Sequence, residues 1–394
     1  MANLIFTLGK NPELSAAELA SYISSRSADF SILAYEKEFL VADTGSSFIP
    51  RIDDLGGTIK VCEVVSIEEN INPETLDAGR FFNLSKNPVN FGLSFYNIPQ
   101  WAQLKETLSE KFKKQLREEK IKAGVVRLTE GRSWLTHVEV INKNLVENGE
   151  AVFCFSSGKY YMAKTVQVHN PFEFQKRDVG RPEQRPIFSI PPRLAKIMVN
   201  LLGITEGTVL DPFCGIGTIL QEAALNGFDV RGTDLDKNCI LSARKNLDWL
   251  KKEYSIELKE LDKKIITADS RHLSKYFEPG SIDGIATEPY LGPPLRGRIE
   301  KSQANKIISG LEELYKKTLQ EAHKILKPGS KVCIISPKIK MKNSGIGLDM
   351  ERLAEQAGFR TVDILKDKIK HGYPLTDSEE RHRLIREINV LESV

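Results

Sequence analysis

The sequence lacks the marks of several large protein classes. No stretch approaches the ~20 apolar residues that a membrane-spanning helix needs, and no basic leader precedes the apolar run at the N-terminus, so we do not expect secretion. The five cysteines are far apart and include no C-x-x-C pair, which disfavours both a zinc site and a disulfide framework. We therefore expect a protein of the reducing cytoplasm, without a metal centre and without a membrane partner.

An excess of charge of one sign is also missing from the chain as a whole. The net charge is +3, which is too small to identify a partner. Residues 1–80 hold 6 Lys and Arg against 13 Asp and Glu, whereas residues 81–170 hold 13 against 8. The basic excess of the second segment is compatible with a phosphate-binding module, and solvated helix faces explain it equally well.

The length of 394 residues predicts two or three domains. Residues 1–75 mix strand and helix signals and predict a small α+β domain. Residues 76–168 predict a second one, with a helix over 101–119 and strands at 91–96, 123–127, 137–140, 151–156 and 160–168. Leu104, Leu108, Phe112 and Leu116 form one apolar row on that helix and must face a core. Residues 169–186 are poor in apolar residues and contain prolines, which predicts a linker.

From residue 187 onward, strands alternate with helices, as in a doubly wound parallel sheet. We expect α/β architecture of the Rossmann-like kind over 187–394, with a helix that starts near Pro191. A long loop is expected between the last two strands, at 359–365 and 381–391. The preceding strands are predicted at Thr208–Asp211, Asp229–Asp234, Ile265–Asp269, Gly284–Glu288 and Lys331–Ser336.

The stretch Val209 to Thr218 is the centre of this half. An apolar run ends in Asp211, and a turn with Gly215 and Gly217 then opens a helix. Glycines let the backbone approach a ligand, and a helix N-terminus offers free N–H groups. The spacing is not the dinucleotide G-x-G-x-x-G, and no Lys-Ser/Thr follows to make a P-loop. A carboxylate ahead of the glycines suits a ligand with a positive charge or an amine.

Carboxylates also end the second and third strands. Asp234 stands about 20 residues after the glycine turn, where a carboxylate accepts two ribose hydroxyls. Asp236 is expected to cap the next helix. Asp269 either accepts from an adenine amine or caps a helix, and the residue alone does not decide between these two roles.

The fourth strand ends in Thr287-Glu288-Pro289-Tyr290. An acidic residue and a proline that leave a sheet beside a cofactor site resemble the D/N-P-P-Y motif of methyltransferases that act on exocyclic amines. The carboxylate accepts the amine N–H bonds, and the aromatic ring stacks the base. A gapless alignment places Glu288 at the acid, whereas the alternative places Thr287 there. We prefer the gapless alignment. Arg296 and Arg298 follow directly and either hold substrate phosphates or are ordinary surface residues.

The chain as a whole resembles the THUMP-domain tRNA guanosine-N2 methyltransferases, which are class I S-adenosylmethionine-dependent enzymes. Besides the motifs above, the resemblance rests on stretches 8–15, 55–60, 176–182, 191–195 and 382–388. It implies a ferredoxin-like domain (1–75), a THUMP domain that holds the tRNA acceptor stem (76–168), a linker and a Rossmann-like catalytic domain. It also implies methylation of N2 of a guanosine in tRNA, guanosine-10 above all, and leaves open the need for a small activator protein.

The site residues carried over with the resemblance fall into three groups. Glu288, Pro289 and Tyr290 are expected to be catalytic, with Glu in place of the usual Asp or Asn. Two rivals remain: a DNA amino-methyltransferase, and an RNA-binding protein that no longer catalyses. The cofactor residues are expected to be Pro191, Asp211, Pro212, Phe213, Cys214, Gly215, Gly217, Thr218, Asp234, Leu235, Asp269 and Ser270, and the RNA-binding residues Lys164, Arg177, Arg181, Arg296 and Arg298.

Overall fold

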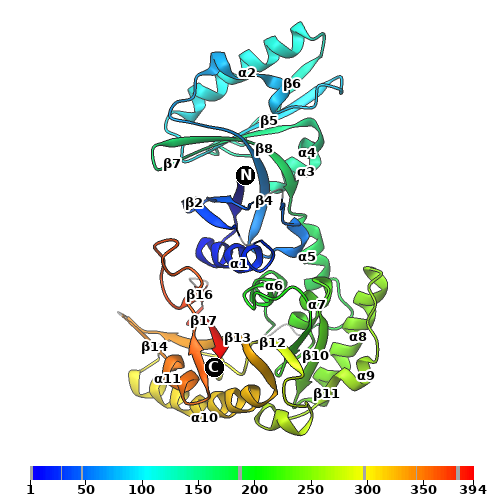
Figure 1. Ribbon diagram of the computed structural model, residues 1–394, viewed down its shortest axis with the longest axis vertical. Coiled ribbons are helices and arrows are strands. Elements are labelled where there is room, and N and C mark those ends of the chain that lie inside the picture. The colour runs from blue at the N-terminus through cyan, green and yellow to red at the C-terminus, as the bar shows by residue number, and fades with distance from the viewer. Residues whose placement is uncertain are drawn as a thin grey trace. The chain divides into compact units, whose positions relative to one another are not determined.

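The structure is a computed structural model that describes residues 3–27, 29–45, 48–184, 189–295, 299–342, 344–378 and 382–394 (Figure 1). The chain divides into two compact units. Unit 1 comprises Met1–Ala16, Ser27–Asp53 and Gly57–Glu173, and unit 2 comprises Ala17–Arg26, Asp54–Gly56 and Phe174–Val394. A search of the described residues finds no helix with the length and apolar character of a membrane span.

Unit 1 is built on one eight-stranded sheet of order β2-β3-β1-β4-β8-β7-β5-β6. Strands β4 and β8 pair antiparallel from Lys60 opposite Val168 to Glu68 opposite Tyr160. The sheet therefore continues across residue 75, and the domain boundary predicted there stays a prediction. The strands are β1 (Asn3–Leu8), β2 (Ser31–Tyr35), β3 (Phe39–Asp43), β4 (Thr58–Glu68), β5 (Val89–Tyr96), β6 (Ala123–Val125), β7 (Glu150–Ser156) and β8 (Lys159–Val168).

Helix α2 (Trp101–Glu118) supplies much of the apolar core on one side of this sheet. Leu108, Phe112 and Leu116 are fully buried, and Leu104 packs against the same cluster, as the four-residue row predicts. Phe112 meets Phe82 and Phe91 edge to face, an arrangement that aromatic rings favour. The other helices of this part of the chain are α1 (Pro12–Ser24), η1 (Ile52–Asp54), η2 (Pro73–Thr75), η3 (Ala78–Arg80), α3 (His137–Asn142), α4 (Leu145–Asn148) and α5 (Pro171–Asp178).

Two of the predicted segments differ in the structure. The strand expected at His137–Val140 is helix α3, because Thr136 and Glu139 form a capping box in which each side chain accepts from the backbone of the other. The apolar alternation that suggests a strand is too short to compete with this local signal. The predicted linker 169–186 contains helix α5, and strand β2 has no counterpart in the sequence-based assignment.

A buried ion pair crosses the sheet of unit 1. Lys60 Nζ donates to Glu150 Oε1 at 2.5 Å, and the two side chains are 1% and 0% exposed. Ser94 Oγ donates to the same oxygen at 2.5 Å, and Thr165 Oγ1 donates to Glu150 Oε2 at 2.6 Å. Glu150 thus joins strands β4, β5, β7 and β8, and its charge is compensated by one cation and two hydroxyls.

Replacing Glu150 with Leu should destabilise unit 1 strongly, because Lys60 would remain buried without its partner. The expected loss is about 3–5 kcal/mol, measured as a lower urea midpoint in tryptophan fluorescence. The double change Lys60→Met/Glu150→Leu should recover most of the loss, because it removes both charges. A single variant that unfolds at the midpoint of the original chain would contradict this account.

Unit 2 contains a nine-stranded sheet whose main order is β11-β10-β9-β12-β13-β17-β15. Strands β11, β10, β9, β12 and β13 run parallel, and β17 runs antiparallel to β13. This confirms the predicted doubly wound sheet. The strands are β9 (Thr208–Asp211), β10 (Asp229–Asp234), β11 (Ile265–Thr267), β12 (Ile282–Thr287), β13 (Leu326–Lys340), β14 (Gly345–Gly347), β15 (Phe359–Thr361), β16 (Leu375–Asp377) and β17 (Leu384–Ser393).

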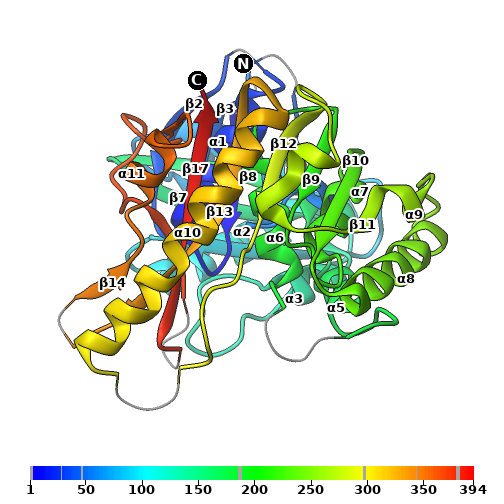
Figure 2. The same cartoon turned by 90° about the horizontal axis from the view of Figure 1, so that it is seen from below.

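The helices of unit 2 connect and cover these strands. Helix α10 packs along the sheet, with Leu311, Tyr315 and Leu319 in one core with Val332 and Ile334 of β13 (Figure 2). Strand β16 lies within the segment expected as a long loop and pairs with β17. The helices are α6 (Pro192–Asn200), α7 (Thr218–Leu225), α8 (Lys237–Glu253), α9 (Leu261–Lys264), η4 (Ser270–Lys275), α10 (Lys301–Ile325) and α11 (Met350–Glu355).

Candidate active site

The turn between β9 and α7 takes the shape that its glycines predict. Gly215 and Gly217 have φ of +51° and +89°, in the left-handed region that glycine adopts without strain. A side chain at Gly215 would project into open space, with no atom within 4 Å, whereas one at Gly217 would meet Ala243 at 3.3 Å. Gly215 therefore leaves the backbone open to a ligand, and Gly217 lets α7 start close to α8.

A hollow opens directly above this turn, and we call it the glycine-turn hollow. It has about 390 Å³ of empty space when its open mouth is included. Of the predicted site residues it brings together Asp211, Phe213, Cys214, Gly215, Thr218 and Glu288. The sequence-based list lacks Ser189, Ile190, Ile216 and Ile219, which also line the hollow. Ser189 and Ile190 directly precede Pro191. Pro191 itself is the N-cap of α6 and does not line the hollow.

Asp211 is the buried carboxylate of the hollow. Its residue is 1% exposed, and its Oδ1 accepts from Thr287 Oγ1 at 2.7 Å and from the Phe213 amide at 3.0 Å. The pKa of Asp211 is raised from 3.8 to about 7, chiefly by burial; the two hydrogen bonds oppose the rise, and the charges of Asp234 and Glu288 add to it. A carboxylate in this setting gains from a cationic partner, because a cation offsets both its desolvation and its acidic neighbours.

Asp234 and Pro212 support the glycine turn. Asp234 Oδ2 accepts from the Gly215 amide at 2.9 Å, and Thr233 Oγ1 donates to the Pro212 carbonyl at 3.0 Å. Leu235 is 65% exposed and does not line the hollow. Asp236 caps α8 by accepting from the Asn238 amide, which confirms the predicted cap. The Asp234 carboxylate contacts Gly215, which lines the hollow, but Asp234 itself does not line it. The predicted ribose contact of Asp234 stays a prediction.

The structure does not bring Asp269 and Ser270 to the glycine-turn hollow. Asp269 caps η4 and forms an ion pair with Arg271 at 2.6 Å, which confirms the capping role, and its adenine contact stays a prediction. Hydrogen bonds from Arg271 lower the pKa of Asp269. Ser270 is buried, and its hydroxyl lies 3.0 Å from Thr318 Oγ1 of α10. The Ser270 side chain thus faces the core, and its cofactor contact stays a prediction.

Glu288 follows the last residue of β12 and lines the hollow together with Asp211. Its side chain is 11% exposed, and its Oε1 accepts from Arg386 Nε at 2.5 Å. Burial raises the pKa of Glu288, and the charge and hydrogen bond of Arg386 oppose that rise. Pro289 is buried and Tyr290 is 54% exposed, so the aromatic ring beside the carboxylate is open to solvent.

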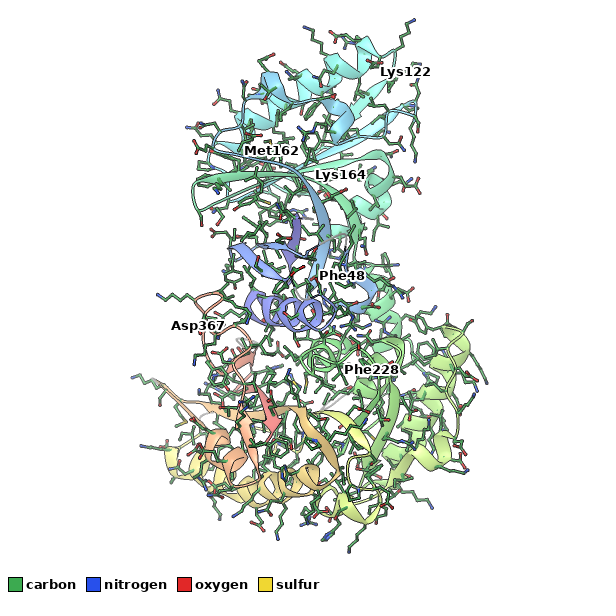
Figure 3. All side chains as sticks on the ribbon, in the orientation of Figure 1. Phe48, Lys122, Met162, Lys164, Phe228 and Asp367 are labelled. Carbon is green, nitrogen blue, oxygen red and sulfur yellow. The ribbon has the colours of Figure 1, made fainter. Side chains whose placement is uncertain are left out.

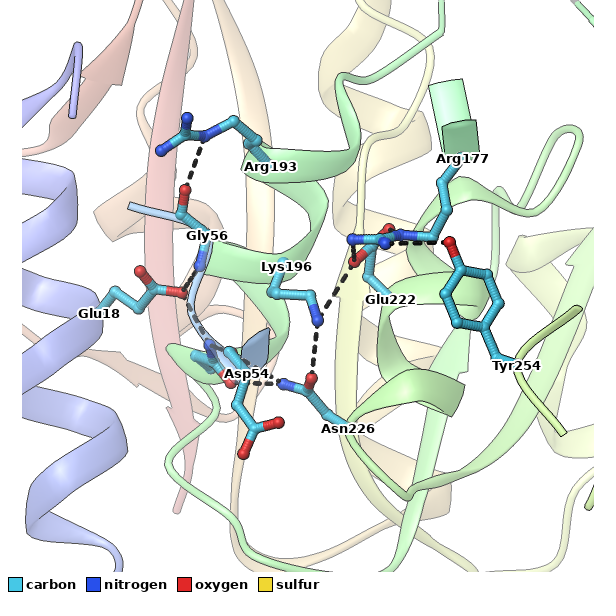
Figure 4. Close-up of polar contacts among 10 residues, drawn as sticks. Glu18, Asp54, Gly56, Arg177, Arg193, Lys196, Glu222, Asn226 and Tyr254 are labelled. Carbon is cyan, nitrogen blue, oxygen red and sulfur yellow. Dashed lines mark hydrogen bonds and ion pairs between the residues drawn. The ribbon is translucent and has the colours of Figure 1, made fainter. Parts of the chain in front are cut away.

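Two of the predicted RNA-binding arginines are buried in unit 2, which corrects their assignment. Arg177 is 5% exposed and its Nε donates to Glu222 Oε1 of α7 at 2.6 Å, while Lys196 Nζ lies 3.4 Å from Glu222 Oε2 (Figure 4). Arg181 is 3% exposed and donates to Thr218 Oγ1 at 2.7 Å. Both guanidinium groups contact residues of α7 and are too buried to reach phosphates at the protein surface.

The network around Glu222 extends to Glu18 of α1 and to Gly56, which follows η1. Lys196 Nζ donates to Asn226 Oδ1 at 3.0 Å, and Asn226 Nδ2 donates to Asn200 Oδ1 at 2.9 Å (Figure 4). Asn200 Nδ2 and the Gly56 amide both donate to Glu18 Oε1 at 2.7 Å. Helices α6 and α7 are therefore fixed by a connected set of buried polar groups whose charges balance locally.

The other RNA-binding residues have different outcomes. Lys164 lies on β8 in unit 1, and its side chain is 41% exposed (Figure 3). Its Nζ lies 3.0 Å from Glu63 Oε2. Its RNA contact stays a prediction. Arg296 and Arg298 lie outside the residues that the structure describes.

The site can be tested for its fit to an adenosyl-sulfonium cofactor. Gly215 offers open backbone, and Asp211 offers a buried carboxylate that a cation would stabilise. Ile190, Phe213 and Ile219 supply apolar walls. The donor set fits, with Asp211 suited to a positive group, and S-adenosylmethionine when bound supplies a methyl group on a cationic sulfur. The parallel sheet and this site together define a class I S-adenosylmethionine-dependent methyltransferase.

Comparison with known proteins agrees with this class. Residues 182–358 match the family model of the RMKL-like methyltransferase domain. The tRNA (guanine(10)-N2)-dimethyltransferase of Methanothermobacter thermautotrophicus is 34% identical over 220 residues, which are 55% of this chain and 53% of that protein. The crystal structure of TrmN from Thermus thermophilus aligns over 100% of both chains with a TM-score of 0.50 and 17% identity, which shows a shared fold.

A further relative settles the family. The "Probable tRNA (guanine(10)-N2)-dimethyltransferase" of Methanothermococcus thermolithotrophicus is 32% identical over 129 residues, which are 32% of this chain and 74% of that protein. The chain belongs to the family of tRNA guanosine-N2 methyltransferases. It spans 53% of the length of the first curated relative.

The buried Asp211 predicts a pH-dependent affinity for S-adenosylmethionine. Because its pKa is about 7 without ligand, binding of a cation below pH 7 must also expel a proton. Between pH 7 and pH 5.5 we expect Kd to rise by roughly fifteenfold in total, and the slope approaches tenfold per pH unit only at the acid end of this range. Isothermal titration calorimetry measures this directly. Asp211→Asn should bind more weakly and without the pH trend, and a Kd of the original chain that stays constant across this range would refute the role of Asp211.

Proposed function

We propose that this chain transfers a methyl group from S-adenosylmethionine to the exocyclic N2 amine of a guanosine in tRNA, with guanosine-10 as the first position to test. The observation that carries the proposal is the position of Glu288, a buried carboxylate that lines the same hollow as Asp211 and Gly215. The relatives named as tRNA guanosine-N2 methyltransferases support the choice of substrate.

Glu288 would supply what the reaction of an aromatic amine needs. The amine lone pair is delocalised into the base, so the free amine is a poor nucleophile. A carboxylate that accepts an amine N–H localises the lone pair on nitrogen. The N–C bond then forms as the C–S bond breaks, its electrons stay on sulfur, and the amine proton passes toward Glu288. Much of the rate would come from holding the two reactants in line.

Pro289 and Tyr290 would complete the substrate pocket. The Pro289 carbonyl is a second acceptor for the amine, and the exposed Tyr290 ring can stack on a base that has left its helix. Thr287 does not compete for the acidic role, because its hydroxyl is buried and donates to Asp211. This geometry favours the gapless alignment of the motif, in which Glu288 replaces the usual Asp or Asn.

The remaining parts of the proposal concern organisation. We propose that residues 1–75 form the ferredoxin-like domain, 76–168 the THUMP domain, 169–186 the connection and 187–394 the catalytic domain. All five cysteines lie among the described residues, are buried and belong to no disulfide, which is consistent with a reducing cytoplasm.

A basic hollow in unit 1 is the best candidate for contact with the RNA backbone. Lys113, Arg117, Lys120 and Lys122, together with Ile121 and Ala123, line a hollow with about 550 Å³ of empty space when its open mouth is included. Lys113 and Arg117 lie about one turn apart on α2, whereas Lys120 follows the end of that helix and Lys122 directly precedes β6 (Figure 3). Across the described residues no carboxylate forms an ion pair with these four side chains, whereas Lys111 pairs with Glu74. Four uncompensated cations around one cavity favour a polyanion.

Replacement of Glu288 by Gln should abolish methyl transfer and leave S-adenosylmethionine binding within twofold. Transfer from labelled cofactor to tRNA transcripts, followed by nucleoside mass spectrometry, measures the product and its position. Transcripts with inosine, which lacks the N2 amine, in place of guanosine-10 provide the matched control. Methylated duplex DNA, or retained transfer by Glu288→Gln, would contradict the proposal. Tight tRNA binding without transfer by the original chain would identify a non-catalytic RNA-binding protein.

Removing charges from the basic hollow should weaken RNA binding in a salt-dependent way. For Lys113→Gln/Arg117→Gln we expect the slope of log K against log salt concentration to become less steep by about 1–2, because each phosphate contact contributes roughly 0.7–0.9. Lys114→Gln, an exposed lysine of α2 that does not line the hollow, is the matched control. Equal slopes for the hollow variant and the original chain in filter binding would exclude this surface as a phosphate contact.

A further inference from the structure

Glu288 belongs to a row of three charged side chains at the edge of the glycine-turn hollow. Arg386 Nε donates to Glu288 Oε1 at 2.5 Å, and Arg386 Nη1 lies 3.7 Å from Asp377 Oδ2. The side chains of Arg386, Glu288 and Asp377 are 20%, 11% and 18% exposed. We call these three residues the acid–arginine row, and it carries one net negative charge when all members are ionised.

The sheet fixes Arg386 on both sides. Strand β17 pairs antiparallel with β13, where Arg386 stands opposite Pro337, and with β16, where it stands opposite Asp377. Thr287, directly before Glu288, pairs with Ile334 on the other edge of β13. The Arg386 side chain therefore reaches Glu288 across β13 from a backbone held by two ladders, which gives its guanidinium little freedom to move.

The hydrogen bond leaves one carboxylate oxygen of Glu288 for another partner. Within the part of the chain that the structure describes, the polar contact of Glu288 is made by Oε1. Glutamate has one more rotatable bond than the aspartate usual at this motif position, so an untethered Glu288 would sample more orientations. Arg386 removes that freedom and leaves Oε2 to accept from a substrate.

We propose that Arg386 is a positioning residue for methyl transfer: it fixes Oε1 of Glu288, directs Oε2 toward the nucleobase amine and keeps the carboxylate ionised. The inference rests on the proposed function and names the group that makes a glutamate effective at this position. Arg386 itself need not touch the substrate, because it acts through Glu288.

The charges around Glu288 explain why it needs this partner. Burial raises the pKa of Glu288, Arg386 opposes the rise, and Asp377 adds to it. The other titratable groups that face it are Asp211 of β9 and Tyr315 of α10, both of which have a raised pKa, chiefly from burial and in part from Glu288. Without Arg386, the largely buried Glu288 would face two carboxylates and no cation from the described residues, and its neutral form would be favoured. A protonated carboxyl is a poor acceptor for the amine N–H.

The kinetic test compares pH profiles of methyl transfer for Arg386→Gln, Arg386→Lys and the original chain. For Arg386→Gln we expect the acid limb of the kcat profile to move up by at least one pH unit, with the KM for S-adenosylmethionine within twofold. Arg386→Lys should restore at least half of this shift. Lys338→Gln is the control, because it breaks a 2.7 Å ion pair with Glu387, the residue next to Arg386, and should leave the profile in place.

A second readout does not depend on catalysis. In protein with ¹³C-labelled glutamate carboxyl groups, the Glu288 resonance is assigned by its loss in Glu288→Gln and then titrated. Its midpoint should rise in Arg386→Gln and stay unchanged in Lys338→Gln. An unchanged midpoint, or a lower kcat with an unshifted profile, would reduce Arg386 to a structural ion pair and overturn the inference. If the original chain transfers no methyl to RNA, the proposed function fails, and the positioning role fails with it even if the midpoint shifts.

Discussion

The burial of negative charge at the ends of parallel strands is the constraint on which the site depends. Strands β9 and β12 run parallel and end next to one another, so Asp211 and Glu288 face the same hollow. Water cannot fully solvate the Asp211 carboxylate, and each acidic neighbour adds to the free-energy cost of its ionised form. The protein offsets part of this cost with Thr287 and Arg386. A bound cation would offset the part of this free-energy cost that remains, and a site for a sulfonium compound requires this property.

Helix α7, which follows the end of β9 and the glycine turn, is also held by buried polar contacts. Helix α7 starts at Thr218, which accepts from Arg181, and carries Glu222, which is paired with Arg177 and Lys196. These arginines come from a segment that looks like a linker in the sequence, yet both are buried. Breaking one partner of such a pair leaves an uncompensated buried charge. Residues of the α5 segment from Phe174 onward therefore belong to unit 2, and its two buried arginines hold α7, the helix that follows the glycine turn.

Local patterns in the sequence were sufficient for the elements that create the site. The apolar run before Asp211 and the glycines after it predict the strand, the turn and the helix, and all three are present. The motif at Thr287 to Tyr290 predicts an acidic strand end, and Glu288 lines the hollow. Such signals work because backbone conformation and burial are decided by residues close together in the chain.

Contacts between distant residues could not be obtained in this way. Arg386 lies 98 residues from Glu288, and only the pairing of β13 with β17 brings them together. Ser270 follows a strand end as a ligand residue should, yet its hydroxyl faces Thr318 of α10, a packing choice with no local signature. The burial of Arg177 likewise depends on Glu222. The capping box at Thr136 and Glu139 was a readable local signal, and it outweighs the strand pattern assigned there.

The most direct test of the central claim is a crystal structure of the chain with S-adenosylmethionine bound. The account predicts the ligand over Gly215, with a positively charged group within hydrogen-bonding or ion-pair distance of Asp211 and the methyl group facing the side of the hollow that Glu288 lines. A ligand bound elsewhere, or one whose charged groups contact neither Asp211 nor its acidic neighbours, would contradict it.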